Sequence, residues 1–194
     1  LKSFGDGMAS VGKSLTIGLT TPIVTGAGYA VKAAAQYESA FAGVKKTVDE
    51  TATTSYEKLS NSIRQMSKEL PASAVEIANV AEVAGQLGIK ADNITDFTKV
   101  MIDLGESTNM SATVAAESLA KFANITKLAP ENYSRLGASI VELGNNFATT
   151  EADITAMASR LAGAGAQIGL SQADIIGLSA ALSSVGIEAE MGGS

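Results

Sequence analysis

Apolar residues in this chain recur at alternating spacings of three and four, in short runs that end at Gly, Pro or polar residues. This spacing places the apolar side chains on one face of an α-helix. Each run lasts about two heptads, which is shorter than the three or four heptads of an extended coiled coil. The runs are Tyr56–Leu70, Ile77–Leu87, Ile94–Leu104, Tyr133–Phe147, Ile154–Ile168 and Ile175–Val185. The sequence therefore predicts an all-α fold, a packed bundle of several short amphipathic helices.

The last two runs also predict which side chains are buried. Because each run steps by three and four, one apolar face is expected per helix. The predicted faces are Ile154, Met157, Leu161, Ala164 and Ile168 in one helix, and Ile175, Leu178, Leu182 and Val185 in the other. A further helix is predicted over Ser111–Ile125, with Leu119 and Phe122 facing inward.

Residues that start and stop helices separate the runs. Ser73, Thr150 and Ser171 each stand three residues before an acidic residue, the spacing at which a hydroxyl and a carboxylate cap a first turn. Four Gly or Asn residues each precede one apolar residue, which predicts a left-handed joint covered by that side chain. These joints are Gly88-Ile89, Asn109-Met110, Gly169-Leu170 and Gly186-Ile187. The pattern predicts a helix–joint–helix arrangement of loose period rather than a strict solenoid repeat.

The N-terminal region has a different character. Ser14–Val31 carries no charge between Lys13 and Lys32, and its eighteen residues reach the lower limit for a membrane-spanning helix. Thr and Gly dilute its apolar residues, and Pro22 would break or kink a helix in its middle. We interpret this run as a buried or self-associating apolar segment, and insertion into a membrane is the alternative. An Ala-rich helix is predicted next, over Tyr29–Val48.

Two parts are predicted along the chain. The polar string Asp49–Ser55 is the best candidate for a hinge between them. Residues 1–54 hold the apolar segment and the Ala-rich helix, and residues 55–194 hold the multi-helix module. Because the chain starts at Leu1 and stops at Ser194 without a capping tail, we expect a fragment whose module continues in a longer polypeptide.

The residue types limit the chemistry of this chain. It has no His, no Cys and no Trp, which excludes Ser-His-Asp and Cys-His nucleophiles, Cys/His zinc sites and disulfides. A net charge of −6 argues against nucleic-acid binding, which needs a basic face. We therefore predict a protein that is not an enzyme, with no catalytic, cofactor-binding or metal-binding residue and no cofactor.

Two groups of residues imitate functional motifs. The glycine run Gly163–Gly169 is close to a dinucleotide fingerprint, but it has one residue too many and follows a helix rather than a strand, so we interpret it as a helix C-terminal joint. Asp92 and Asp96 lie one helical turn apart, as roughly do Asp103 and Glu106, without a calcium-loop pattern. We interpret these acids as helix caps and solvated faces.

The order of the segments resembles the core region of phage tail tape measure proteins. The resemblance begins in the apolar stretch KSLTIGLTTPIVTGAGYAVKAAA and continues through Tyr37–Val48. It extends through AAESLAKFANIT at 115–126 and GLSQADIIGLSAALSSVGIEAEMGGS at 169–194. The ordered set covers about residues 30–194, although no single motif in it is diagnostic.

This resemblance implies a virion structural protein of a long-tailed bacteriophage or a phage tail-like particle. It implies a protein in the tail tube lumen near the tip, present in the host cytoplasm during tail assembly, that sets tail length and leaves at genome ejection. The implied partners are further copies of itself, with a trimer favoured, together with tail tube and tail tip or baseplate hub proteins. No catalytic residue is implied.

The breaks between the helices refine this expectation. A continuous helix of 194 residues would reach about 290 Å, because each residue rises about 1.5 Å. Pro71, Pro130 and the glycine joints divide the chain into short helices instead. We therefore predict a compact module that anchors the tape at the tip or initiator complex. The alternative function is a membrane-active module that enters the host envelope through Ser14–Val31 during DNA ejection.

Overall fold

A computed structural model describes residues 21–188, and the surroundings of side chains from residue 30 onward. Over this range the chain forms eight α-helices, one short 3-10 turn and no strand, so the predicted all-α fold is confirmed. The helices are α2 (Thr21–Thr47), α3 (Tyr56–Glu69), α4 (Ala74–Gln86), α5 (Ala91–Ser107), α6 (Ala112–Thr126), α7 (Tyr133–Asn146), α8 (Glu151–Gln167) and α9 (Gln172–Ser184), with the 3-10 turn η2 (Pro130–Asn132) before α7.

The chain divides into two compact units, Leu1–Ser39 and Ala40–Ser194, and the division falls inside α2. In the first unit the described residues form the N-terminal part of α2. Pro22 lies within α2 as described, so it does not end the helix. Part of the predicted apolar segment, residues 14–20, lies outside the described residues. The predicted division at residue 54 stays a prediction.

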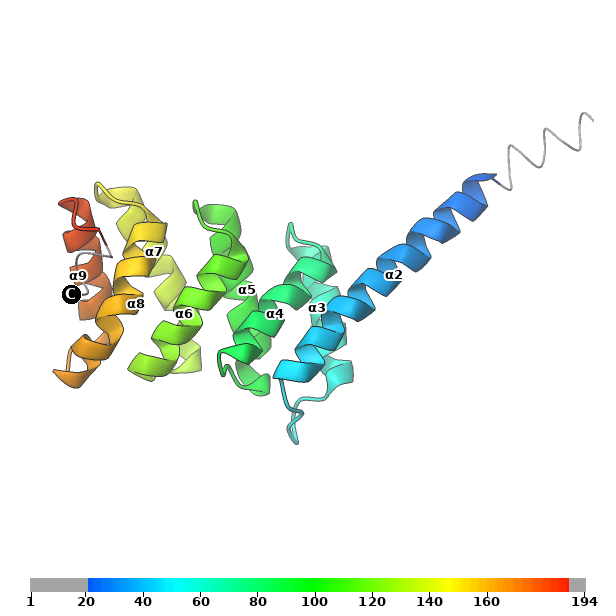
Figure 1. The fold of residues 1–194 in the computed structure, drawn as a ribbon, viewed down its shortest axis with the longest axis horizontal. Coiled ribbons are helices and arrows are strands. Elements are labelled where there is room, and N and C mark those ends of the chain that lie inside the picture. The colour runs from blue at the N-terminus through cyan, green and yellow to red at the C-terminus, as the bar shows by residue number, and fades with distance from the viewer. Residues whose placement is uncertain (1–20, 189–194) are drawn as a thin grey trace, which may run out of the picture. The chain divides into compact units, whose positions relative to one another are not determined.

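In the second unit, α3 to α9 alternate between two layers (Figure 1). One layer holds α3, α5, α7 and α9, each packed on the next in this order, and the other holds α4, α6 and α8 in the same way. Between the layers α3 packs on α4, α4 on α5, α5 on α6, α7 on α8 and α8 on α9, whereas α6 and α7 are joined through η2 without packing on each other in this way. The unit is therefore a row of helical hairpins rather than one long rod.

The hairpins repeat with a regular period. The N-caps of α4, α6 and α8 are Ser73, Ser111 and Thr150, which are 38 and 39 residues apart. In each case the side-chain oxygen accepts a hydrogen bond from a backbone N–H in the first turn. Sequence reasoning predicted only a loose period. The structure corrects this to a two-helix unit of about 40 residues, a length typical of helical repeat arrays.

The C-terminal joints follow the same period. The left-handed residues after α4, α6 and α8 are Gly88, Lys127 and Gly169, with φ of 89°, 52° and 83°. The residue after each donates its N–H back into the helix, as Leu170 N–H does to the Gly165 carbonyl at 2.9 Å. Such joints satisfy carbonyls that a helix end leaves open. The predicted joints at Gly88, Gly169 and Gly186 are confirmed.

The predicted joint at Asn109 is wrong. Thr108 caps α5 in an extended conformation, and Lys127 is the one non-glycine residue with positive φ in the range that the structure describes. The Thr108 hydroxyl donates to the Leu104 carbonyl at 2.6 Å and accepts from the Met110 N–H at 3.2 Å. Because this side chain satisfies the helix end, Asn109 has no need of the left-handed region.

The predicted buried faces of the central helices are confirmed, except at Phe147, the last residue of the run in α7, which lies just after the helix and is exposed. Leu59, Ile63 and Met66 of α3 are buried, as are the predicted inward residues of α6. The largest fully buried side chains gather in α4 to α9 and include Ile77, Ile94, Phe97, Met101, Ile102, Leu119, Phe122, Ile140, Ile154, Met157 and Ile175. Phe97 packs edge-to-face on Tyr133 of α7, with ring centroids 5.1 Å apart. The core therefore lies between the two layers.

The buried face of α9 differs from the predicted one. α9 buries Ile175, Ile176, Ser179 and Ala180, whereas the predicted Leu178 and Val185 are 42% and 73% exposed. At the end of α8, Ala164 and Ile168 are also exposed, and Ile168 reaches 77%. The helices approach closely on the other side of α8, where a Cβ added to Gly165 would lie 2.8 Å from Ile175 Cγ1. Gly165, rather than the spacing of the apolar residues, therefore decides which faces of α8 and α9 pack together.

Candidate interaction surface

The glycine run that imitates a nucleotide motif is a helix terminus, as predicted. Gly163 and Gly165 lie in the last turns of α8, and Gly169 is the left-handed joint that follows. No strand precedes the run, and no phosphate-binding loop forms there in the described range. The prediction of a helix C-terminal joint is confirmed.

The acidic pair Asp92 and Asp96 does not form a joint site. Asp92 lies in the first turn of α5, and its Oδ1 accepts hydrogen bonds from the hydroxyls of Thr51, Thr53 and Thr54, each at 2.6 Å. These bonds stabilise the carboxylate and lower the pKa of Asp92 to about 2. Asp96 is exposed. Across the residues whose positions are described, no three acidic side chains gather where a metal ion could bind.

The three threonines belong to the polar string predicted as a hinge. In the structure, residues 48–54 form the loop between α2 and α3, which Asp92 ties to α5. Glu50 accepts from the Tyr56 N–H at 2.7 Å, and the Tyr56 hydroxyl donates to the Val48 carbonyl at 3.0 Å. Sequence reasoning missed this hydrogen-bonded loop, because its partner Asp92 is 38 residues or more away along the chain.

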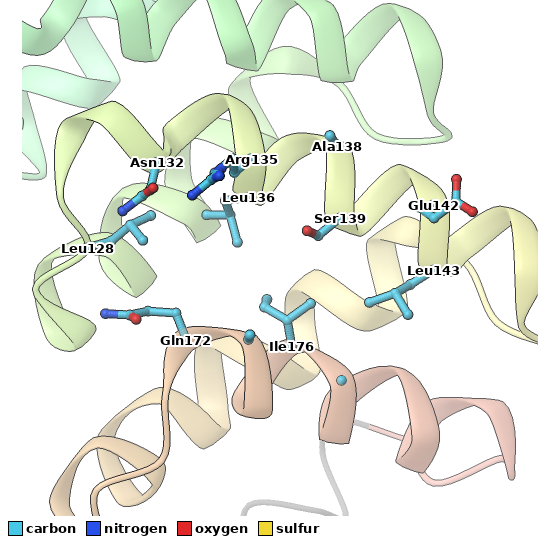
Figure 2. Close-up of a pocket in the computed structure, with 12 residues that line it drawn as sticks. Leu128, Asn132, Arg135, Leu136, Ala138, Ser139, Glu142, Leu143, Gln172 and Ile176 are labelled. Atoms are coloured by element: carbon cyan, nitrogen blue, oxygen red, sulfur yellow. The ribbon is translucent and has the colours of Figure 1, made fainter.

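A groove lies between α7 and α9, in the layer of odd-numbered helices. Its volume is about 780 Å³. Figure 2 shows Leu136 of α7 and Ile176 of α9 facing each other across it, with Arg135 toward one end and Glu142 toward the other. The remaining lining residues are Leu128, Asn132, Ala138, Ser139, Leu143, Gln172, Ala173 and Gly177. The groove therefore has an apolar floor and one charge of each sign on its rim.

The neighbouring pair in the same layer packs more closely. Between α5 and α7 the hollow is about 330 Å³. A Cβ added to Gly137 of α7 would lie 3.0 Å from Val100 Cγ1, so the glycine allows these two helices to approach. In the α7–α9 groove, a Cβ added to Gly177 would meet no atom within 4 Å. The space beside α9 is open rather than filled by a neighbouring helix of the described chain.

A second feature adjoins the groove. Asp174, Leu178 and Ala181 share one face of α9, the C-cap residue Val185 continues their spacing of four, three and four, and all four are exposed. We call this face the α9 ridge. Phe147, just after α7, is also 48% exposed. Contiguous exposed apolar surface of this kind marks interaction sites in soluble proteins.

Tyr133 is buried against Phe97, and burial together with the charge of Glu131 raises its pKa. Its ring therefore serves packing. None of the helices in the described range is both long enough and apolar enough to cross a membrane.

Comparison with known proteins gives one family. Residues 60–194 match the model of the family described as phage-related minor tail protein, which covers α4 to α9 and most of α3. Neither the curated proteins nor the solved structures contain a match.

Proposed function

The chain belongs to the phage-related minor tail protein family, and from this premise we propose that it is part of a tape measure protein. In this proposal it lies in the tail tube lumen, sets tail length during assembly and anchors the tape at the tip or initiator complex. The family supports a structural role in the virion tail. The order of segments described above supports the narrower assignment.

The anchoring part of the proposal is supported by helix length. α3 to α9 contain between 13 and 17 residues each, so each spans about 20–26 Å at 1.5 Å per residue. They fold back on one another and expose little of their length as a straight rod. Such a unit suits a fixed end of the tape better than its measuring shaft.

The proposed partners follow from this role. They are further copies of the chain, with a trimer favoured, tail tube proteins and tail tip or baseplate hub proteins. We assign it no enzymatic activity and no specific binding to nucleic acid, since the chain lacks His and Cys and carries a net charge of −6.

In-frame deletions in the encoding gene test the proposal. One removes residues 55–194, and a matched one removes 140 residues of a continuous helical stretch elsewhere in the same gene. We expect the first to abolish tails and the second to shorten them by about 210 Å, measured by negative-stain electron microscopy. If both deletions shorten tails by that amount, the segment is ordinary measuring tape and the anchor proposal is wrong.

A membrane-active module is the second candidate, and one observation favours it. Residues 14–31 contain no charged side chain. Under this candidate the chain would release dye from liposomes, and Ile23→Asp would stop the release by placing a charge in the apolar run. Ile125→Asp, on the exposed surface of α6, is the matched control that should leave release unchanged. Absence of leakage from the unaltered chain would exclude this candidate.

A further inference from the structure

The two layers of helices carry charges in opposite orders on their outer faces. In the layer of odd-numbered helices a base precedes an acid, as Lys99 precedes Glu106 in α5. In the layer of even-numbered helices an acid precedes a base, as Asp153 precedes Arg160 in α8. Each pair is seven residues apart, nearly two turns, so its members lie on one side of their helix with an axial separation of about 10.5 Å.

The neighbouring helices repeat these orders. In α7, Arg135 precedes Glu142 by seven residues, and in α6, Glu117 precedes Lys121 by four. All four side chains are exposed. The outer face of α5 and α7 is therefore complementary in sign to the outer face of α6 and α8 when the helices of the two faces run parallel.

The two bases of the even-numbered layer form a pair of like charges. Lys121 and Arg160 each stand ten residues after the N-cap of their helix, and the Ser159 hydroxyl donates to the Ser118 carbonyl at 3.3 Å, so both cations lie at the same height. Neither side chain has a hydrogen-bond or ion-pair partner among the described residues. Because neighbouring like charges repel, acids on an opposing surface would stabilise both cations.

The odd-numbered layer presents such acids around the hollow between α5 and α7. Asp103 and Glu142 line this hollow, together with the apolar side chains of Val100 and Leu104. None of the described residues that line it is basic. Glu106 follows Asp103 by one turn of α5 and is exposed.

Both faces are open within the row of hairpins. α6 exposes Lys121 although α8 packs beside it, and α5 exposes Glu106 although α7 packs beside it. Arg160 occupies in α8 the position that Lys121 occupies in α6. A further helix beside α8 would therefore leave Arg160 exposed in the same way.

The alternation of the layers limits how two such faces can meet. Helices of one layer run parallel to one another and antiparallel to the other layer (Figure 1). A half turn of a second copy in the plane of the layers makes its even-numbered helices parallel to the odd-numbered helices of the first copy and reverses their order. α8 of the second copy then lies along α5, and α6 lies along α7.

One register brings all four pairs of opposite charges together. Gly137 of α7 lies against Val100 and Leu104 of α5, which sets the relative heights of these two helices. When Asp153 is placed beside Lys99, the other pairs fall within one helical turn of each other; they are Arg160 with Glu106, Glu117 with Arg135, and Lys121 with Glu142. Without the half turn, α8 lies antiparallel along α7 and like charges meet, so that arrangement is disfavoured.

We propose that the outer face of α5 and α7 binds the outer face of α6 and α8 of a second copy of this chain, with Asp153 beside Lys99 and Arg160 beside Glu106. This inference rests on the self-association in the proposed function and assigns a surface to it. The two surfaces lie on opposite faces of one copy, so the contact is head-to-tail. A trimer built from it is a stack of three copies with one open surface at each end.

Cross-linking tests the placement directly, because the chain has no cysteine of its own. Ile125→Cys is made in one preparation and Asn145→Cys in another, since the register places these exposed residues of α6 and α7 at nearly the same height. With a short bismaleimide we expect a mixed covalent dimer. The matched control pairs Ile125→Cys with Asn61→Cys, an exposed asparagine of α3, and should give none. Equal cross-linking in both mixtures, or none in the first, would overturn the placement.

Charge exchange tests the pairing by sedimentation equilibrium. Arg160→Glu and Glu106→Arg should each weaken self-association about tenfold, which corresponds to 1.4 kcal/mol, and the double variant should restore it. Lys68→Glu on α3 makes the same change in net charge as Arg160→Glu but should have no effect, and combined with Glu106→Arg it should not restore association. Circular dichroism checks that all variants fold.

The outcomes separate this surface from the proposed function. Self-association that Arg160→Glu leaves unchanged, or a double variant that stays weak, would overturn the surface and leave self-association standing. A chain that is monomeric at every concentration would overturn both the surface and the proposed self-association. None of these results decides the deletion experiment on tail length, which tests the anchoring role separately.

Discussion

Two glycines in α8 offer a matched test of how the last two helices pack. Gly163 and Gly165 are two residues apart and point to different sides of the helix. A Cβ added to Gly163 meets no atom within 4 Å, whereas one added to Gly165 lies 2.8 Å from Cγ1 and 2.9 Å from Cδ1 of Ile175. The Ile175 side chain is buried and β-branched, so it has little freedom to move away.

The expected magnitudes follow from these distances. Replacing Gly by Ala inside a helix stabilises it by about 1 kcal/mol. Gly163→Ala should therefore raise the free energy of unfolding by about 1 kcal/mol, or the melting temperature by about 2–4 °C for a chain of this size. Gly165→Ala has the same helical gain but adds an overpacking cost of about 1–3 kcal/mol. The two variants should differ by about 1–3 kcal/mol, with Gly165→Ala the less stable.

Urea unfolding followed by circular dichroism measures both variants. A further variant locates the cause: in an Ile175→Val background, which removes the Cδ1 methyl, the cost of Gly165→Ala should fall. This difference between backgrounds is the coupling that a direct contact produces. If Gly163→Ala and Gly165→Ala stabilise the chain equally, α9 does not pack on the Gly165 side of α8, and the assignment of the α9 ridge to the exposed side fails with it.

Three further changes test other parts of the fold. The Thr98 hydroxyl is buried without a hydrogen-bond partner, so Thr98→Val should raise the free energy of unfolding by about 1 kcal/mol in urea titration. Because the pKa of Asp92 is lowered from 3.8 to about 2 in the folded chain, its stabilising effect should be complete above pH 4 and disappear as the pH falls toward 2. Asp92→Asn should remove this part of the pH dependence and speed hydrogen exchange in the loop 48–54, and Asp96→Asn should do neither. Ser111→Ala removes the N-cap of α6 and should cost about 1 kcal/mol, whereas Ser134→Ala on the exposed side of α7 should change stability by less than about 0.5 kcal/mol.

Local sequence rules predicted the early helices of the module well. In α3 the residues between Leu59, Ile63 and Met66 all have polar side chains, which are hydroxyls, amides or a guanidinium, so only one face can be buried. In α9, by contrast, Ala, Gly, Leu and Ile occur all round the helix. A period of three and four then selects no single face, and the prediction that Leu178 and Val185 are buried was wrong. The outcome depended on the close approach at Gly165, which spacing does not reveal.

The α7–α9 groove could not be predicted from local sequence spacing either. Arg135, Leu136 and Ile176 are individually ordinary residues of two predicted helices, and nothing in their spacing shows that α7 and α9 leave a groove. The Asp92 hydrogen bonds are equally non-local. The groove and the Asp92 hydrogen bonds both depend on the period of the hairpins, because this period determines which helices far apart in the sequence become neighbours. A predicted period of 38 or 39 residues between the Ser/Thr caps would have brought α7 and α9 into one layer.

The same period bears on whether this segment measures length or anchors it. A two-helix unit of about 40 residues laid out as one straight helix would extend the tape by about 60 Å. Folded into the hairpin row, each unit advances the row by about one interhelical spacing, 8–10 Å. Each residue therefore adds about six times less length in the hairpin row than in a straight helix. This is a disadvantage for a segment that measures tail length, but not for one that anchors the tape. Deleting residues 73–110, one complete unit from one N-cap to the residue before the next, should accordingly never shorten tails by 57 Å, the value for 38 residues in a rod at about 1.5 Å each. Tails shortened by that amount would mean that the hairpins unfold into an extended helix inside the tube, and the anchoring role would have to be abandoned.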